Sequence, residues 1–257
     1  MHPIEVNKST DTRRADLPFP ILVAHQPEFL PWLGNISKAT IGDVYFILDT
    51  VQYCKELFQN RNKIRIKGGD GWHWLIIPIK GGRKKLMNWQ EVIIDNSQSW
   101  KRKHLNSIKM SYSRSPYFNQ IYNEIKSIYD GFTGNKLIDF LIEFIKYAHL
   151  KFKVNIPIYK TSDLIRLGYD ISGSKSDLIL NMCKVVNAKT FIFGAQGRDY
   201  IEKDKFNQVE YRFQNFNHPT YKQIHGDFMS HMSFIDLLFN YGDNSVNILN
   251  KSQYDKQ

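Results

Sequence analysis

The sequence lacks most features that mark secreted, membrane or metal-binding proteins. Its 257 residues include two cysteines, Cys54 and Cys183, which lie far apart and give no CxxC spacing. That excludes a disulfide framework and suits a reducing compartment. No run of about 18 apolar residues occurs, and residues 1–20 hold no apolar stretch of signal-peptide length. We expect a cytoplasmic protein without membrane insertion, and no metal site.

Internal repeats, low-complexity tracts and obvious linkers are also missing. We therefore expect a flexible N-terminal arm over residues 1–20, a single α/β domain over 21–250, and a C-terminal tail over 251–257. Acidic residues are fewer than basic ones, which leaves a net charge of +10. Residues 61–85 carry eight Lys or Arg side chains and one acidic side chain, Asp70. Such a segment attracts polyanions, although a solvated basic surface explains it equally well.

An apolar run that breaks into polar residues stands near the start of the chain. Ile21–Ala24 predicts a buried strand, and Pro27 ends that strand because it lacks an N–H and has a fixed φ. His25 and Gln26 therefore lie where the strand ends. In open α/β sheets, ligands bind beyond the carboxyl ends of the strands. A rigid turn and a short helix that carries Lys38 are expected to follow.

A second apolar run, Val44–Leu48, ends in the same way. The polar residues that follow it are Asp49, Gln52, Lys55, Asn60, Arg61, Asn62 and Lys63. Two successive strands with polar ends suggest that both contribute to one site. A guanidinium such as that of Arg61 can bind a phosphate or a carboxylate with two hydrogen bonds, while an internal Asp49–Arg61 ion pair is an equally good interpretation.

The remaining patterns predict the rest of the fold. Alternation over 63–67 and 72–80 around a glycine-rich turn predicts a basic β-hairpin. Helical periodicity predicts a helical insertion over about 100–152. Strands over 158–164, 190–193 and 208–213, with helices over 175–186 and 199–206, predict parallel βαβ units. We therefore expect an α/β fold with a Rossmann-like, mainly parallel central sheet.

Two further groups of polar residues are candidates for a site. Gly194–Gly197 with Gln196 follows a strand and can present N–H groups to an anion, although tight packing explains it nearly as well. Near the end of the chain, polar side chains that could line a pocket are His218, Tyr221, Gln223 and Asp236. Because Ser233 and Asp236 have capping-box spacing, we favour a structural role for Asp236.

Three stretches resemble one family. HQPEFLPWLGNISK (25–38), DVYFILDTVQYCKELFQNRNKI (43–64) and HPTYKQIHGDFMSHMSFIDLLFNYG (218–242) are similar to the WbqC-like family, in its order and spacing over roughly 21–250. Members are encoded among genes for bacterial surface polysaccharide. The resemblance implies a transferase of O-antigen and lipopolysaccharide biosynthesis. It would add an acyl or aminoacyl group, such as glycyl, to the amine of a nucleotide-linked amino-deoxysugar.

Such a reaction needs a base and donors for the developing oxyanion. The candidate catalytic residues are His25, Asp49 and Gln26, with Asn60 or Asn62 as further donors. Arg61 with Lys38 or Lys63 would hold the pyrophosphate, and Trp32, Tyr53 or Tyr221 could stack on the base or sugar. The other expected substrate-binding residues are Gln52, Lys55, Gln196, His218, Gln223 and Asp236.

The sequence does not distinguish between two kinds of acyl donor. A free amino acid requires ATP, with Mg²⁺ a possible companion, whereas an aminoacyl-tRNA would use the basic segment as its footprint. Neither a Walker motif nor a known RNA-binding module is present. A nucleic-acid-binding module, with Trp72 and Trp74 as a stacking surface, is one alternative. A non-catalytic scaffold of a polysaccharide-synthesis complex is another.

Overall fold

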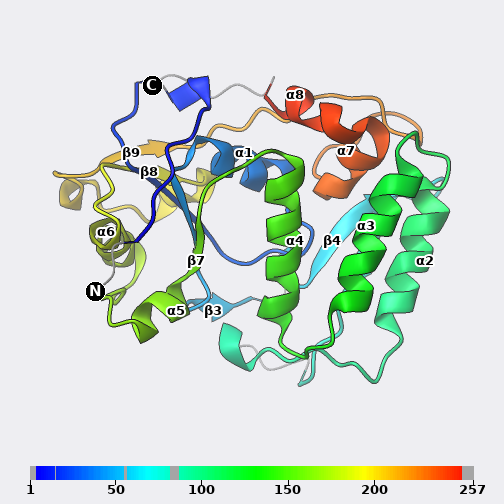
Figure 1. The fold of residues 1–257 in the computed structure, drawn as a ribbon, viewed down its shortest axis with the longest axis horizontal. Helices are drawn as coiled ribbons and strands as arrows, with labels where there is room; N and C mark the ends of the chain where they lie inside the picture. The colour runs from blue at the N-terminus through cyan, green and yellow to red at the C-terminus, as the bar shows by residue number, and fades with distance from the viewer. Residues whose placement is uncertain (1–3, 15, 55–56, 82–86, 251–257) are drawn as a thin grey trace.

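A computed structural model describes residues 4–14, 16–54, 57–81 and 87–250 of the protein. Its main sheet has five strands and lies on the left in Figure 1, with α2, α3 and α4 (residues 100–151) on the right. Its strands are β1 (Ile21–His25), β2 (Val44–Ile47), β7 (Ile158–Lys160), β8 (Thr190–Phe193) and β9 (Glu210–Phe213). All neighbours in the order β7-β2-β1-β8-β9 are parallel (Figure 1). The predicted Rossmann-like, mainly parallel sheet is therefore confirmed.

The strand order reverses beside β1. From β1 the chain passes through α1 (Leu33–Ile41) to β2 and later to the outer strand β7. It then runs through α5 (Thr161–Arg166) and α6 (Lys175–Val185) and crosses to the other side of β1, where β8 and β9 lie. The loops after β1 and β8 thus leave the sheet edge in different directions. The crevice between two such loops is where open α/β sheets bind ligands.

The central strand is buried on both faces. Ile21 and Val23 belong to a core shared with α1 and with helices later in the chain. Leu22 and Ala24 belong to a second core, formed with α6 on the opposite face. Burial on both faces explains why this strand is a continuous apolar run rather than an alternating one.

The helical insertion packs against the loop that follows β1. Its helices α2 (Trp100–Tyr112), α3 (Phe118–Gly131) and α4 (Leu137–Lys151) stand side by side, with α7 (Phe234–Tyr241) and α8 (Ser245–Leu249) nearby (Figure 1). The Phe29 ring lies 6.2 Å from that of Phe140 and 5.7 Å from that of Phe144, both on α4. The loop after β1 therefore packs against α4 of the insertion through Phe29.

The predicted hairpin forms a separate antiparallel pair, β4 (Arg61–Arg65) and β5 (Trp72–Ile76). Asn62, Ile64 and Leu75 are buried on its inner face. The opposite face alternates cations and indoles, because Lys63 pairs with Trp74 across the strands and Arg65 with Trp72. A shorter pair, β3 (Gln52–Tyr53) with β6 (Met87–Asn88), lies elsewhere.

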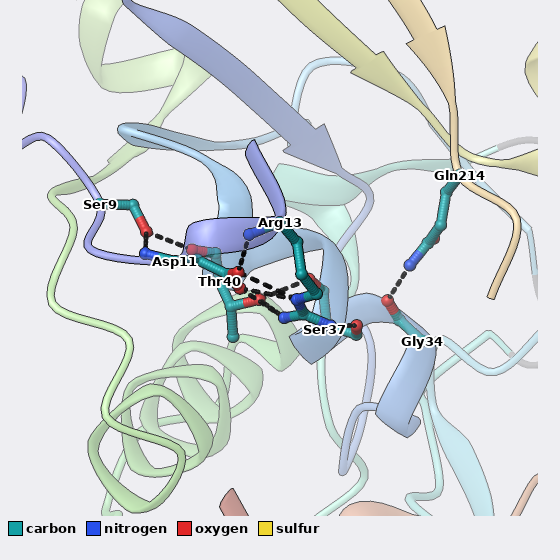
Figure 2. A network of polar contacts seen from close by, with 7 residues as sticks. All are labelled: Ser9, Asp11, Arg13, Gly34, Ser37, Thr40 and Gln214. Atoms are coloured by element: carbon teal, nitrogen blue, oxygen red, sulfur yellow. Dashed lines mark hydrogen bonds and ion pairs between the residues drawn. The ribbon is translucent and has the colours of Figure 1, made fainter. Parts of the chain in front are cut away.

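The N-terminal segment, which we expected to be a loose arm, makes specific contacts over its described residues. The fully buried Asp43 carboxylate forms an ion pair with Arg14 and accepts hydrogen bonds from the backbone N–H groups of Ser9 (2.8 Å) and Ile21 (2.7 Å). Arg13 reaches Thr40 Oγ1 at 2.7 Å (Figure 2). A buried carboxylate needs charged or donor partners, and this segment supplies them.

Two predicted elements differ from the structure. The strand expected over 158–164 ends at Lys160, because Ser162 N donates to the Asp49 carboxylate (2.9 Å) and α5 begins there. The helix expected over 199–206 is replaced by 3-10 turns η3 (Ala195–Asp199) and η4 (Lys203–Lys205). The other 3-10 turns are η1 (Thr12–Arg14), η2 (Trp89–Glu91) and η5 (Gly242–Asn244). In the described part of the chain, every helix is too short or too polar to span a bilayer.

Candidate functional site

His25 stands at the carboxyl end of the central strand, where the sheet changes direction. Its Nδ1 lies 2.8 Å from the carbonyl oxygen of Gln26, so Nδ1 donates and Nε2 is the acceptor of the neutral ring. Burial lowers the pKa of His25, and Lys38 lowers it further, while Glu28 opposes both. The side chain keeps 27% of its surface exposed. At neutral pH it is therefore an uncharged base that a ligand can reach.

A buried group of charged and polar residues lies against this histidine. Glu28 Oε1 is 3.7 Å from His25 Nε2, and Glu28 Oε2 accepts a hydrogen bond from Asn35 Nδ2 at 2.9 Å. Lys38 Nζ donates to the Ala24 carbonyl (2.8 Å), and burial lowers the pKa of Lys38 to about 8. We call His25, Glu28, Asn35 and Lys38 the His25 cluster. Together they combine a base with a buried carboxylate and a buried ammonium.

The loop after β1 is tied to the start of the hairpin. Gln26 Oε1 accepts a hydrogen bond from Gln59 Nε2. Phe29 N donates to the Phe58 carbonyl at 3.2 Å. Asn62 Nδ2 donates to the carbonyl oxygens of Phe29 (3.1 Å) and Leu30 (2.6 Å). The Gln26 amide oxygen already accepts the hydrogen bond from Gln59, so Gln26 can offer its amide hydrogens to a ligand.

Aromatic rings form a wall along the same edge of the sheet. Trp32 stacks on His231 with ring centres 5.5 Å apart and meets Phe216 edge-on at 5.3 Å. His218 lies 5.6 Å from His231, and burial lowers the pKa of His218. A Cβ at Gly34 would lie 2.2 Å from the indole, so only glycine lets Trp32 lie over the start of α1. We call Trp32, Phe216, His218 and His231 the aromatic wall.

The strands on the far side of β1 reach the same region. Gln196 is exposed in the turn that follows β8. Gln214, directly after β9, donates through Nε2 to the carbonyl oxygen of Gly34 at 2.7 Å (Figure 2). The first turn of α1 is thereby fastened to the end of β9, and it positions Trp32 and Asn35.

Asp49, which we expected to act at the same site as His25, makes its hydrogen bonds with Gln90, Thr161 and Ser162 instead. Its carboxylate accepts hydrogen bonds from Gln90 Nε2 (2.8 Å), Thr161 Oγ1 (3.0 Å), Ser162 N (2.9 Å) and Ser162 Oγ (2.5 Å). These bonds fasten the end of β2 to the start of α5. With four neutral donors around a side chain that is 1% exposed, Asp49 has a structural position.

The last predicted group forms a closed network. Asp236 accepts from Tyr112 Oη (2.8 Å), Tyr221 Oη (2.9 Å) and Gln223 Nε2 (2.9 Å), and burial raises the pKa of Asp236. We call these four residues the Asp236 network. The capping box does not form, because Ser233 makes no side-chain cap bond. Asp236 is structural, but through long-range hydrogen bonds.

The other predicted residues lie apart from the His25 cluster or outside the described residues. Asn60 Nδ2 donates to the Ile77 carbonyl at 2.9 Å, which joins two hairpin segments. Gln52 is exposed on β3. Arg61 and Lys63 lie on the outer face of the hairpin, and Lys55 lies outside the described residues.

The sequence did not predict Glu28, Asn35, Gln59, Phe216 and His231 as site residues. Glu28 stands three residues after His25, and that spacing was the available signal. Gln59 directly precedes the predicted Asn60, and Phe216 stands two residues before His218. Among the residues that the structure describes, no three His, Cys, Asp or Glu side chains cluster as metal ligands would.

The fold and the site together define an α/β protein of Rossmann-like topology, with an ionisable cluster at the point where the strand order reverses. The chain belongs to the WbqC-like protein family, whose model matches residues 26–248. It is also similar to an uncharacterised protein of Mycobacterium tuberculosis, with 26% identity over 222 residues, which are 84% of this chain and 92% of that protein. No solved structure matches this chain significantly.

Proposed function

We propose that this protein transfers an acyl or aminoacyl group, such as glycyl, to the amine of a nucleotide-linked amino-deoxysugar in the synthesis of bacterial surface polysaccharide. The observation that carries the proposal is the setting of His25. Its Nδ1 is fixed on the Gln26 carbonyl, and its Nε2 is a partly exposed acceptor beside the Glu28 carboxylate. Amine acylation needs such a base, because the attacking nitrogen must lose a proton.

The bond changes follow from this geometry. The sugar nitrogen attacks the carbonyl carbon of an ester or thioester donor, so a C–N bond forms and the C–O or C–S bond breaks. His25 Nε2 takes the proton from the nitrogen and returns it to the leaving oxygen or sulfur. Glu28, 3.7 Å away, stabilises the imidazolium between these steps. The amide hydrogens of Gln26 are the candidate donors to the oxyanion.

The surroundings of His25 suit an amino sugar on a nucleotide. The neutral amine carries two N–H groups, so one can donate a hydrogen bond to the Glu28 carboxylate while His25 takes the other proton, whereas a hydroxyl group has one O–H only. The aromatic wall offers ring faces to a nucleobase or sugar.

The test is a transfer assay with a nucleotide-linked amino sugar as acceptor. The donors are glycine with ATP and Mg²⁺, a glycyl thioester, and glycyl-RNA, and the acylated product is detected by mass spectrometry. We expect His25→Ala to slow transfer about a hundredfold or more. His73→Ala, which removes an exposed histidine at the other end of the hairpin, is the matched control. An unchanged rate in His25→Ala would favour the scaffold instead.

A further inference from the structure

The outer face of the hairpin carries cations seated on indole rings. The Arg61 guanidinium lies 4.7 Å above the Trp74 ring. Lys63 Nζ lies 4.2 Å from the centre of the Trp72 ring and 5.2 Å from that of Trp74. These four side chains are only partly buried. We call them the cation–aromatic face, and the ring contacts hold its charges in place before any ligand arrives.

The rings of this face run toward the His25 cluster. Trp72 and Trp74 are 5.4 Å apart, and Phe58 lies 5.6 Å beyond Trp74. The Phe58 carbonyl bonds Phe29 N, and the next residue, Gln59, bonds the side chain of Gln26. A row of aromatic rings thus leads from the hairpin to the neighbour of His25.

A basic cavity lies at the other end of the same hairpin. It has a volume of about 460 Å³, and its lining includes Arg65, Lys67, Arg114 and His225, with no carboxylate among the described residues that line it. The Arg65 guanidinium donates to the carbonyl oxygens of Gly71, His225 and Asp227. Arg65 also interacts with the buried Asp236 carboxylate, so Lys67 and Arg114 are the lining cations whose charge favours an anion.

Both features lie along one strand. Arg61, Lys63 and Arg65 alternate along β4 at a spacing of about 7 Å. Arg61 and Lys63 are partly exposed on the outer face, and Arg65 is 3% exposed at the wall of the cavity. A ligand that matches this pattern has repeated negative charges and repeated flat rings, as single-stranded nucleic acid does. One nucleotide-linked sugar has a single base and a single diphosphate, so it can occupy only part of the row.

We infer that the cation–aromatic face and the basic cavity bind the single-stranded 3′ end of an RNA, whose terminal aminoacyl ester then lies beside His25. This inference rests on the proposed function and names its donor. The sugar amine attacks the ester carbon, a C–N bond replaces the C–O bond, and the proton taken by His25 ends on the released ribose hydroxyl. The ester is already activated, so ATP is not consumed in this step.

The first experiment measures binding of a labelled single-stranded RNA oligonucleotide by fluorescence anisotropy at several salt concentrations. We expect Lys63→Glu and Trp74→Leu each to weaken binding about tenfold or more, whereas Trp74→Phe keeps most of it. Lys109→Glu makes the same charge change at an exposed position of α2 and should bind like the wild type. Thermal unfolding of each variant shows whether it is folded.

Equal RNA affinity in wild type, Lys63→Glu and Trp74→Leu would overturn the inference. So would a rise in KM for the nucleotide-linked sugar in Lys63→Glu with unchanged RNA affinity, because the face would then hold the diphosphate.

A second experiment separates this inference from the proposed function, using glycyl-RNA and a glycyl thioester as alternative donors. Transfer from glycyl-RNA that falls in Lys63→Glu and is lost in His25→Ala supports both. Transfer from the thioester alone, without RNA binding, overturns the RNA donor and leaves the transferase intact. RNA binding at the face with no transfer from any donor overturns the proposed function and the donor role with it.

Discussion

Two buried carboxylates of this protein have opposite kinds of surroundings. Asp236 is enclosed by three donors from Tyr112, Tyr221 and Gln223, and none of its surface is exposed. Glu28 has one close donor, Asn35, and its other oxygen faces a partly exposed histidine at 3.7 Å. The first carboxylate has all its partners inside the protein. The second keeps a position that a ligand can share.

The number of donors around each carboxylate distinguishes a structural role from a chemical role better than residue type does. Each carboxylate has a side-chain amide beside it, and each has a tyrosine nearby: Tyr45 Oη donates to the Asn35 amide oxygen, and Tyr221 Oη donates to the Asp236 carboxylate. A closed network rigidifies a core, and an opening beside an ionisable ring permits proton transfer. Stability should therefore depend mainly on the Asp236 network, and activity on the His25 cluster.

The largest expected effect is on the closed network. Asp236→Ala leaves two tyrosine hydroxyls and the Gln223 amide buried without their acceptor. We expect a loss of about 3 kcal/mol or more in the free energy of unfolding, measured by urea denaturation. Asp227→Ala, at an exposed loop position, should change it by less than about 0.5 kcal/mol. Similar losses in the two variants would remove the distinction between a closed and an open carboxylate.

The next effect concerns the back of the His25 cluster, where His149 packs edge-on against Tyr45 at 5.1 Å. Burial lowers the pKa of His149 to about 4 from 6.5. Between these values the unfolded chain binds more protons, so stability that is present above pH 6.5 is lost as the pH falls toward 4. From pH 7 to pH 5 this amounts to about 2 kcal/mol.

His149→Phe should reduce this acid-induced loss by that amount. It should also stabilise the protein by about 1 kcal/mol at pH 7, since Nδ1 of His149 is buried without a partner among the described residues. Urea midpoints at the two pH values measure both effects. His73→Phe, at an exposed position, is the control, and an equal pH response in wild type and His149→Phe would contradict the prediction.

The smallest effect is a shift in the pH dependence of transfer. Glu28 raises the pKa of His25 and Lys38 lowers it, so Glu28→Gln and Lys38→Met should move the acid limb of kcat/KM in opposite directions. Glu28→Gln should move it to lower pH and Lys38→Met to higher pH. Shifts in the same direction would show that His25 is not the group whose protonation limits the rate.

Local patterns predicted the sheet well, because β1, β2 and β8 match apolar runs of about the right length and β9 lies within the alternating stretch 208–213. They failed where a distant partner decides the outcome. Residues 158–164 read as one strand, yet the Asp49 carboxylate, more than 100 residues earlier, starts a helix at Thr161. The prediction of Asp236 as a capping residue failed for the same reason: its hydrogen-bond donor Tyr112 lies on α2, far away in the sequence.

The site was predicted in part. His25, Gln26, Lys38 and Trp32 were named because they follow the central strand, and the structure brings them to one edge of the sheet. Glu28 was missed, since a carboxylate after a proline looks like any loop residue until its burial is known. The hairpin residues were named for charge, while the seating of Lys63 on two indoles follows from strand register and is invisible in composition.

The position of β1 in the middle of the sheet limits which fragments of the protein can fold. The family match begins at residue 26, one position after β1 ends at His25. A fragment trimmed to residues 26–248 would lose the strand between β2 and β8, together with the Arg14 partner of Asp43. The remaining strands would have no neighbour to pair with across the gap. An expression clone of this protein therefore has to start well upstream of the recognisable family motif.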